Sequence, residues 1–505
     1  MGARHALNAN RSDRLGRRLL QWCIVSNQQP SLTAVQRAAV HDLMRAIPVV
    51  GEVGQRFAAA GHGISLVGGS VRDTLLGRLR ADLDFTTSAR PADIEACLAG
   101  WVDATWDIGR EFGTIGARVG GLHLEITTYR SDAYASGSRK PTVTYGDTLH
   151  GDLSRRDFTV NAMAVSLPDG ELVDPYGGVG DLAARRLRTP GTPQASFDDD
   201  PLRMMRAVRF AAQLQFDVDP GVIAAINEMG DRIAIVSSER IRDELVKLVL
   251  TAQPRPGLAL LVETGLAQLV LPELPALQLE VDEHHRHKDV YQHSLTVLDQ
   301  AIALEVGVPG GGPDFVTRFA ALLHDIGKPR TRRFTSDGTV TFHHHDVVGA
   351  KMARRRMKAL RFSNDVTDDV ARLIELHLRF HGYGSGDWTD SAVRRYVRDA
   401  GPLLERLHVL TRADCTTRNS RKAARLRRTY DELEQRITVL AENEELAAMR
   451  PDLDGRQIMD TLGIEPGPVV GKAYKFLLER RMDEGPLGTE QARAELLAWW
   501  AGRSG

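Results

Sequence analysis

The sequence predicts an α+β protein, in which a small mixed sheet near the N-terminus is followed by a long helical body. Between residues 101 and 130 apolar and polar residues alternate as in strands, with Gly120-Gly121 as the turn of a hairpin. After Pro190 and Pro193 the apolar residues recur mainly at helical spacing. At 505 residues the chain is too long for a single hydrophobic core. We therefore expect several domains.

The composition shifts and the Pro- and Gly-rich breaks divide the chain into five parts. The first is rich in arginine, and we expect a disordered basic arm there, with a transit peptide as the alternative. The other parts are an α/β head, a helical neck, a helical body and a helical tail. In chain order the five parts are residues 1–30, 31–185, 186–275, 276–425 and 426–505.

The bulk composition excludes some classes of protein. A hydrophobic content of 42%, a charged content of 26% and a net charge of −1 are ordinary for a globular protein and exclude a general basic coat for nucleic acid. Three scattered cysteines without Cys-x-x-Cys spacing indicate a reducing compartment, so we expect a cytoplasmic protein without structural zinc. No apolar run approaches the roughly 20 residues that span a bilayer, so we expect no membrane partner.

A predicted strand, Ile64–Val67, runs into Gly68-Gly69 and then into a predicted helix, Val71–Leu79. Glycines allow a ligand to approach the backbone closely, and the N-terminus of a helix attracts anions. The segment therefore predicts a phosphate site, and we include Arg72 and Asp73 among its nucleotide-binding candidates.

Two carboxylates follow at strand spacing. Asp82 and Asp84 face the same side of a strand, whereas Leu83 between them points into the core. Paired carboxylates beside a phosphate site are typical of two-metal phosphoryl transfer, so we expect two Mg²⁺ ions here. Glu125, on the predicted strand Leu122–Thr128, is a candidate third carboxylate, although a glutamate on a strand is commonplace.

These segments resemble the nucleotidyltransferase core of the DNA polymerase β superfamily, in the version found in class II CCA-adding enzymes and bacterial poly(A) polymerases. The resemblance implies a polymerase-β-like head followed by a neck that recognises the base, a body and a tRNA-binding tail. It also implies catalysis by Asp82 and Asp84, with tRNA, CTP and ATP as substrates, and Glu125 stays a candidate third catalytic carboxylate.

A second motif is Arg155-Arg156-Asp157-Phe158-Thr159-Val160-Asn161-Ala162. Asp157 and Asn161 are four residues apart at a predicted helix start, where a carboxylate and an amide can bracket a ribose. A helix cap beside a solvated basic pair is the alternative. The segment resembles the family's ribose motif, which implies that Arg156 contacts the triphosphate and Asp157 the sugar.

A third motif begins at Asp199-Asp200-Pro201, an acid followed by a helix-starting proline. Asp200, Arg203 and Arg206 recur at helical spacing and could form only a solvated stripe. The match to the family's Glu-Asp-x-x-Arg motif implies instead that Asp200 and Arg203 read the base of the incoming nucleotide. Arg206 and Arg209 would then reach the triphosphate.

CCA-adding enzymes and poly(A) polymerases of this family differ in a sequence motif that follows the carboxylate pair. Here the stretch reads Ile108-Gly109-Arg110-Glu111-Phe112-Gly113-Thr114, and Glu111 stands where poly(A) polymerases carry a second basic residue. This favours CCA addition over poly(A) addition. Addition of only CC or only A remains open.

Histidines and aspartates in three later segments resemble the HD phosphohydrolase domain, whose His…His-Asp…Asp set binds a divalent metal between helices. The alternatives are a metal-dependent phosphohydrolase acting on RNA or nucleotides and a remnant within an RNA-binding body. The set is His293, His324, Asp325 and Asp414, with His345 and His377 as ligands for a second ion.

Overall fold

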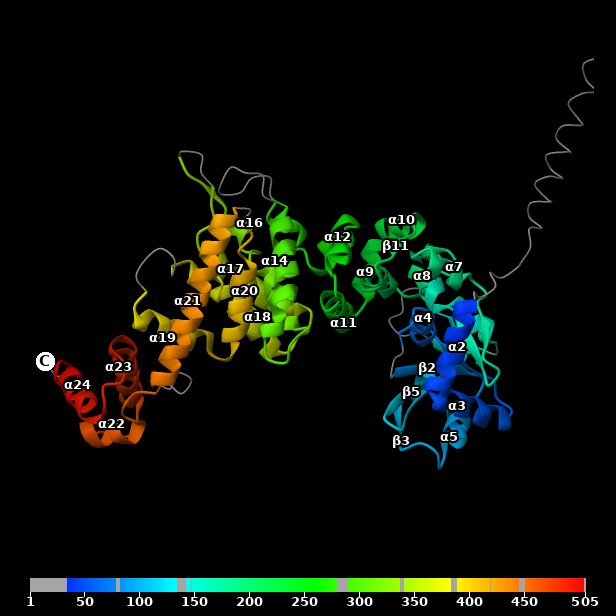
Figure 1. Cartoon of the computed structure of the whole chain (residues 1–505), viewed down its shortest axis with the longest axis horizontal. Coiled ribbons are helices and arrows are strands. Elements are labelled where there is room, and N and C mark those ends of the chain that lie inside the picture. Colours follow the sequence, from blue (N-terminus) through cyan, green and yellow to red (C-terminus); the bar gives the residue numbers. More distant parts are fainter. Residues whose placement is uncertain are drawn as a thin grey trace, which may run out of the picture. The chain divides into compact units, whose positions relative to one another are not determined.

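The computed structural model divides into two compact units, the head unit Met1–Ile235 and the helical unit Val236–Gly505 (Figure 1). The expected basic arm, residues 1–30, lies outside the described residues. The residues that the structure describes are 34–78, 82–133, 142–146, 148–278, 289–336, 340–382, 388–417, 419–444 and 450–503.

A seven-stranded mixed sheet forms the centre of the head unit, with strand order β3-β4-β5-β2-β1-β8-β9. Only β2 and β5 pair in parallel, and the other neighbours are antiparallel. The predicted mixed sheet is thereby confirmed. The strands are β1 Ile64–Val67, β2 Asp82–Thr87, β3 Ala104–Gly109, β4 Thr114–Val119, β5 Leu122–Thr128, β8 Ala164–Leu167 and β9 Glu171–Val173; β6 Arg130–Ala133 and β7 Thr142–Tyr145 form a separate pair.

The predicted hairpin is confirmed. Gly120 and Gly121 join β4 to β5 with φ of +55° and +81°. Two-residue turns with positive φ at both positions match the right-handed twist of the strands, and glycine adopts them without steric cost.

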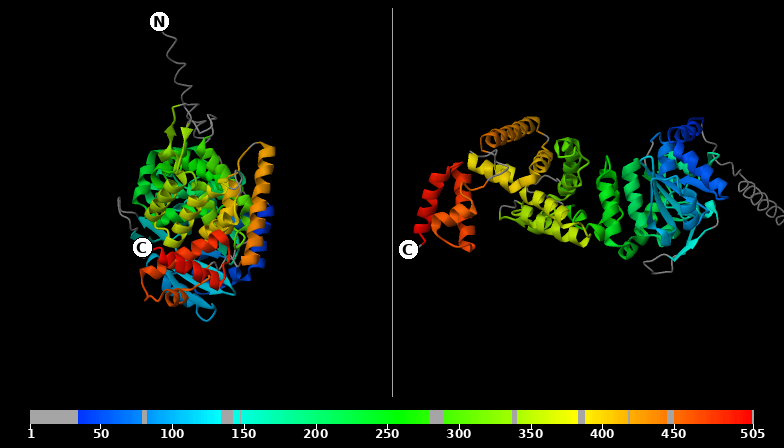
Figure 2. Two further views of the ribbon diagram at one scale, coloured as in Figure 1. Left: turned by 90° about the vertical axis from the view of Figure 1, so that its left-hand side faces the viewer. Right: turned by 90° about the horizontal axis from the view of Figure 1, so that it is seen from below.

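Helices cover one face of the sheet. α2 (Ala34–Ala46) and α3 (Pro48–Ala59) are separated at Pro48, which starts a new helix. They pack with α5 (Pro91–Leu98) against inward-facing residues of the strands, among them Leu83 and Phe85 (Figure 2). Because side chains alternate along β2, Asp82 and Asp84 point to the opposite face. The carboxylates therefore lie away from the helical layer.

Further helices and one short strand pair complete the head unit, some of them between the strands of the sheet in sequence and some after β9. Side chains of one of these helices, α9, contact the ribose motif, as described below. The elements are α4 Gly69–Leu75, η1 Arg110–Phe112, α6 Leu149–Ser154, η2 Thr159–Asn161, α7 Gly178–Ala183, β10 Arg186–Leu187, α8 Pro193–Asp199, α9 Leu202–Leu214, β11 Asp217–Val218, α10 Pro220–Met229 and η3 Gly230–Ile235.

The helical unit contains one short strand pair, β12 Arg333–Phe334 and β13 Val340–Thr341. The expected boundary between residues 425 and 426 falls inside its longest helix, α21. The helices are α11 Ser238–Val249, α12 Arg255–Glu263, α13 Leu266–Val270, η4 Pro275–Leu277, α14 Val290–Leu304, η5 Glu305–Gly307, α15 Phe315–Leu323, α16 Lys328–Thr331, α17 His345–Ala359, α18 Asn364–Leu376, η6 Arg379–Gly382, α19 Asp390–Ala400, η7 Gly401–Leu403, α20 Leu404–Ala413, α21 Ser420–Glu444, α22 Gly455–Leu462, α23 Pro468–Glu484 and α24 Thr489–Ala501.

The last three helices, α22 to α24, share a small core of their own, built around Leu453, Ile458, Leu477 and Leu496. Among the helices of the described segments, none combines the length and the apolar character needed to cross a membrane.

A tight turn before α7 supports the ribose motif. Asp174 accepts hydrogen bonds from the backbone N–H groups of Gly178 (2.7 Å) and Val179 (2.9 Å). A Cβ on Gly178 would lie 2.2 Å from the carbonyl oxygen of Thr159 and 2.7 Å from Cγ of Met163. Only glycine therefore allows α7 to pack this closely against η2.

We predict that Gly178→Ala lowers the free energy of unfolding of the head unit by about 1–3 kcal/mol, because backbone atoms must move to admit the methyl group. Gly180→Ala in the same helix is the matched control, since a Cβ there meets nothing within 4 Å. It should leave stability equal or higher, because alanine favours helices. Thermal unfolding checks both variants, and equal midpoints for the two would contradict the close packing.

Candidate active site

Gly68 lies where the backbone passes between a cation and a carboxylate. It has a φ of +67°, and a Cβ there would lie 3.0 Å from Nη1 of Arg156 and 3.9 Å from Oδ2 of Asp84. α4 begins directly after it at Gly69, two residues before the predicted start at Val71. It ends at Leu75, four residues before the predicted end at Leu79. A side chain at residue 68 would therefore crowd the guanidinium, and the glycine keeps the backbone bare between Arg156 and the carboxylate side of the sheet.

The three candidate catalytic carboxylates share one face of the sheet. In the parallel β2–β5 pair, Asp84 lies opposite Glu125 and Asp82 lies opposite His123. Leu83 is buried, whereas Asp82 and Glu125 are exposed and Asp84 is half-buried. Paired residues of neighbouring strands point to the same side, so Glu125 stands beside Asp84. Oxygen ligands clustered in this way suit hard divalent cations such as Mg²⁺.

Ser70 joins the glycine segment to this carboxylate strand, a role that the sequence analysis missed. Its Oγ donates to the carbonyl oxygen of Asp82 (3.3 Å) and accepts from the backbone N–H of Asp84 (3.1 Å). The side chain is buried. Ser70 therefore sets the position of both carboxylates relative to the start of α4. Nothing in its local sequence signals this, because its partners are 12 and 14 residues away.

Asp152 is a second residue that was missed, and it orients the adjacent arginines. Arg155 donates to its Oδ1 from Nη2 (2.9 Å), and Arg156 donates to its Oδ2 from Nη2 (3.0 Å). Burial of Asp152 by itself raises the pKa of its carboxyl group, but the two guanidiniums outweigh burial and lower that pKa. Arg156 is thereby held between Asp152 and Gly68. The spacing of three and four residues along α6 is the only sequence signal for this arrangement.

The ribose motif is tied to α4 and α9 by a chain of buried hydrogen bonds. Arg72 donates to Oδ1 of Asp73 (2.9 Å) and to Oδ1 of Asn161 (2.6 Å). Asn161 donates from Nδ2 to Oδ1 of Asp157 (3.0 Å), and Arg206 donates from Nε to Oδ2 of Asp157 (2.8 Å). The expected adjacency of Asp157 and Asn161 is present, although Asn161 ends a short 3₁₀ turn, η2, and no α-helix starts there.

The carboxylate of Asp157 is held ionised by this network. Burial by itself raises its pKa, but the charge of Arg206 and the hydrogen bond from Asn161 outweigh burial and hold that pKa well below its usual range. Arg206, expected at the triphosphate, pairs with Asp157 in this structure. An anionic acceptor at this place suits a sugar hydroxyl.

Phe210 gathers three arginines. Its ring lies 4.0 Å from the guanidinium carbon of Arg209, 5.2 Å from that of Arg72 and 5.4 Å from that of Arg206. Phe158 meets the same ring edge-on at a centroid distance of 5.8 Å. Arginine over an aromatic face is favourable. The ring therefore holds cations of α4 and α9 together beside the ribose motif, which is a role that the helical spacing alone did not reveal.

Arg203, one member of the expected base-reading pair, is held in a defined position. Its Nη1 donates to the carbonyl oxygen (3.1 Å) and to Oγ (2.9 Å) of Ser196, and its Nη2 donates to the carbonyl oxygen of Arg155. Asp200 accepts through Oδ1 from the backbone N–H of Leu202 (3.1 Å). Arg203 thus lies next to the ribose motif. Base reading by Asp200 and Arg203 stays a prediction.

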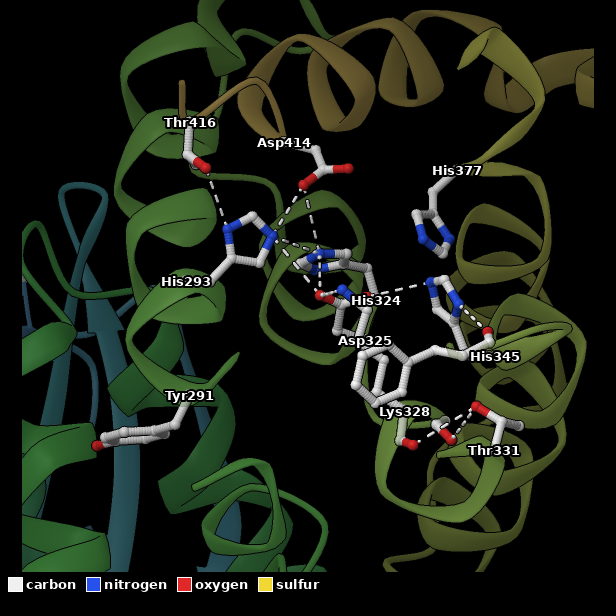
Figure 3. Close-up of polar contacts among 12 residues, drawn as sticks. Tyr291, His293, His324, Asp325, Lys328, Thr331, His345, His377, Asp414 and Thr416 are labelled. Atoms are coloured by element: carbon white, nitrogen blue, oxygen red, sulfur yellow. Dashed lines mark hydrogen bonds and ion pairs between the residues drawn. The ribbon is translucent and has the colours of Figure 1, made fainter. Parts of the chain in front are cut away.

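In the helical unit the structure brings all six predicted metal-ligand candidates together (Figure 3). Nε2 of His293 lies 3.3 Å from Nε2 of His324 and 3.0 Å from Oδ1 of Asp414. Oδ1 of Asp325 lies 3.3 Å from Nε2 of His345. One possible ligand set is His293, His324 and Asp414, and the other is Asp325, His345 and His377.

The imidazoles are oriented as metal ligands are. Nδ1 of His324, His345 and His377 lies 2.9, 2.8 and 2.6 Å from a backbone carbonyl oxygen three residues earlier. Nδ1 of His293 lies 3.2 Å from Oγ1 of Thr416. Such partners direct Nε2 toward a metal. Nε2 of His377 is buried without a hydrogen-bond partner from the protein, so it is available to a ligand.

The electrostatics of the cluster agree with a cation site. Burial and the neighbouring His324 lower the pKa of His377 to about 4, so its imidazole is neutral and could act as a metal ligand. Burial also lowers the pKa of His324, but Asp325 and Asp414 outweigh it and raise that pKa to about 10. The carboxylates therefore attract a positive charge to this place, which a metal ion can supply. The donor set fits a divalent transition metal.

Comparison with known proteins matches the head unit and the histidine cluster to different families. Residues 64–188 match the family described as "Poly A polymerase head domain", and residues 215–277 match "Probable RNA and SrmB- binding site of polymerase A". Residues 290–419 match "HD domain". The carboxylate face and the histidine cluster thus fall in separate family matches.

Several relatives match along most of the chain. An "A-adding tRNA nucleotidyltransferase" of Deinococcus radiodurans is 32% identical over 446 residues, which cover 87% of this chain and 96% of the relative. A "CC-adding tRNA nucleotidyltransferase" of Thermus thermophilus is 32% identical over 446 residues, with 86% and 94% covered. A "CCA-adding enzyme" of Latilactobacillus sakei is 30% identical over 454 residues, with 89% and 96% covered.

The fold agrees with solved structures. The Bacillus stearothermophilus CCA-adding enzyme in complex with CTP has a TM-score of 0.62 at 24% identity, covering 94% of this chain and 99% of its own. At this identity the likeness concerns the fold, whereas the longer sequence matches concern the family. The chain belongs to the family of CCA-adding enzymes and related tRNA nucleotidyltransferases, with an HD domain in its helical unit.

Proposed function

We propose that this protein adds the sequence CCA to the 3′ end of tRNA, using CTP and ATP. The 3′-hydroxyl attacks the α-phosphate of the nucleotide and pyrophosphate leaves. The placement of Gly68 between Arg156 and Asp84, with Glu125 beside Asp84, is the observation that carries the proposal. It combines a bare glycine backbone, a cation that can bind a triphosphate and a carboxylate face that can bind metals.

The residues divide the work as follows. Asp82, Asp84 and Glu125 would hold two Mg²⁺ ions, which when bound supply Lewis acidity at the attacking and leaving oxygens. Arg156 binds the triphosphate beside Gly68 and Gly69. Arg72 and Arg209, whose guanidiniums lie over the ring of Phe210, contribute positive charge. Asp157 accepts a hydrogen bond from a ribose hydroxyl, oriented by Asn161, which favours ribonucleotides.

Asp200 and Arg203 select the base. Cytosine and adenine both present an amino donor beside a ring-nitrogen acceptor, which suit a carboxylate and a guanidinium. Uracil and guanine present a carbonyl where the carboxylate expects a donor. They are rejected because binding would leave polar groups unpaired. The contacts of Arg203 with Ser196 support this role, since they hold its guanidinium in place.

The five-part organisation also belongs to this proposal. The head, residues 31–185, carries the chemistry, and the neck, residues 186–275, reads the base. The HD-like part and the tail, residues 276–425 and 426–505, would serve the RNA, and the protein would work in the cytoplasm. The separate core of α22 to α24 supports a distinct tail.

The length of the added sequence is the decisive measurement, because the relatives are named for A, CC and CCA addition. Purified protein with Mg²⁺ is given a tRNA that ends at the discriminator base, with CTP and ATP singly and together. We expect two C residues with CTP alone and CCA with both. A product that stops at CC with both nucleotides, or one that gains A only on a CC end, would establish partial addition. A long A tail would establish a poly(A) polymerase.

A second function, phosphohydrolysis in the HD domain, is favoured by the buried, partnerless Nε2 of His377 and the inward-directed imidazoles. A divalent metal held there would activate water toward a phosphate ester. Hydrolysis of terminal and cyclic phosphates on ribonucleotides is the assay.

Gly68→Ala should reduce nucleotide addition at least about a hundredfold, because the methyl group enters the space between Arg156 and Asp84. Gly77→Ala is the matched control. It also has a positive φ, +73°, but a Cβ there meets nothing within 4 Å. Single-turnover extension of tRNA measures both. Equal losses would show that backbone strain, rather than the lost space, is responsible.

Arg203→Ala should relax nucleotide choice more than it slows transfer. We expect the preference for CTP over UTP to fall by roughly a hundredfold or more, since the acceptor nitrogen loses its donor. Arg232→Ala, which removes a surface pair with Asp198, is the control. Ratios of kcat/KM for the two nucleotides give the result, and unchanged selectivity would contradict base reading by Arg203.

Asp325→Asn should remove bound divalent metal and phosphohydrolysis while leaving CCA addition intact. Ser294→Ala is the control, since its buried hydroxyl next to His293 has no hydrogen-bond partner. Metal content per chain and the two activities are measured together. Metal retained by Asp325→Asn would contradict the proposed ligand set.

A further inference from the structure

A strand pair projects from the helical unit beside the histidine cluster. β12 and β13 pair through Arg333 with Thr341 and Phe334 with Val340, and they stand out from the helices near α16 (Figures 1 and 2). In sequence they lie between the ligand candidates Asp325 and His345. The segment from Arg330 to Phe334, which runs from the end of α16 into β12, is called the basic arm strand below. It is distinct from the basic arm expected at residues 1–30.

The basic arm strand exposes an aromatic ring. Phe334 is 67% exposed, whereas its cross-strand partner Val340 is buried. The guanidinium of Arg332 lies 4.9 Å from the centroid of the Phe334 ring. An exposed phenyl ring gains nothing from folding, so its place beside arginine points to a ligand with both a flat face and negative charge.

Three arginines of this strand lack acidic partners. Within the described segments, the side chains of Arg330, Arg332 and Arg333 make no hydrogen bond or ion pair, and Nε of Arg332 is buried without a hydrogen-bond partner. Some arginines of the helical unit are paired with carboxylates, as Arg318 is with Glu305 and Arg356 is with Glu273. The arm strand therefore carries positive charge that no described part of the protein neutralises.

Both ends of the projection are joined to the ligand cluster. Nζ of Lys328, at the start of α16, lies 2.9 Å from Oδ2 of Asp325. The same Nζ lies 5.6 Å from the ring centroid of Phe342, and the carbonyl oxygen of Phe342 lies 2.8 Å from Nδ1 of His345. A strand bound along the arm would therefore run toward the cluster.

We propose that the basic arm strand binds single-stranded RNA, with a base stacked on Phe334 and phosphates on Arg330, Arg332 and Arg333. Stacking on an exposed ring requires an unpaired base, which excludes a duplex. A flat, sequence-independent contact plus phosphate charge is the usual mode for single strands. This surface lies outside the head unit and goes beyond nucleotide addition, because it assigns a separate RNA contact to the helical unit.

The test measures binding of a fluorescein-labelled 12-nucleotide single-stranded RNA to the full-length protein without nucleotides. Phe334→Ala should weaken binding at least about fivefold, the smallest effect expected from the loss of one stacked base. Arg333→Ala should weaken binding and reduce its salt dependence by about 0.7 in the logarithmic slope. Val306→Ala is the control, since Val306 is 79% exposed in the same unit and carries no charge.

RNA containing 4-thiouridine supplies a second readout, since its photocrosslink should map to the peptide that contains Phe334 and disappear in Phe334→Ala. Crosslinks only in the head unit, with unchanged affinity in Phe334→Ala, would overturn the proposal. Equal affinity for the duplex of the same sequence, or an acidic peptide that binds the arm in place of RNA, would also overturn it. Because binding is measured without either reaction, failure of nucleotide addition or hydrolysis leaves this outcome unaffected.

Discussion

A buried carboxylate is costly unless cations or donors surround it, and three such carboxylates organise the proposed nucleotide site of the head unit. Asp152 holds Arg155 and Arg156, and Asp157 holds Arg206. Asp181 accepts from Thr159 of the ribose motif and from two arginines, Arg186 and Arg188. Asp157 and Asp181 join separate elements, and Asp152 orients two arginines of its own segment, so the fold itself holds these arginines in place.

The same constraint shapes the helical unit, with imidazoles in place of guanidiniums. Asp325 is buried and lies against His324, His345 and Lys328. The charges around it hold the pKa of its carboxyl group well below the usual range, although burial by itself raises it. A buried anion among neutral and cationic nitrogens is the electrostatic setting of a metal ligand. The residues around Asp325 come from several helices that are far apart in sequence.

Local motifs predicted several contacts of the candidate active site, because those contacts depend on particular residues at short spacing. The alternation Asp82-Leu83-Asp84 on a strand placed both carboxylates on one face, as found. The four-residue spacing of Asp157 and Asn161 predicted their contact. Ser70, Asp152 and Phe210 were missed as site residues. Serine and phenylalanine have no distinctive pattern there, and their partners come from other elements. The contact of Arg206 with Asp157 also joins residues 49 apart in sequence.

The sequence by itself determined the α+β class, the glycine turn, the carboxylate strand and the identity of the metal-ligand candidates, because each follows from backbone periodicity or from the donor atoms of a residue. Only the tertiary structure decided that Glu125 stands beside Asp84 and that six ligands from five helices or their ends meet in one cluster. Strand register and helix packing depend on the burial of apolar surface across the whole unit, which no short motif encodes. Short motifs therefore determine which donor atoms the site contains, and the packing of the whole unit determines how those atoms are arranged.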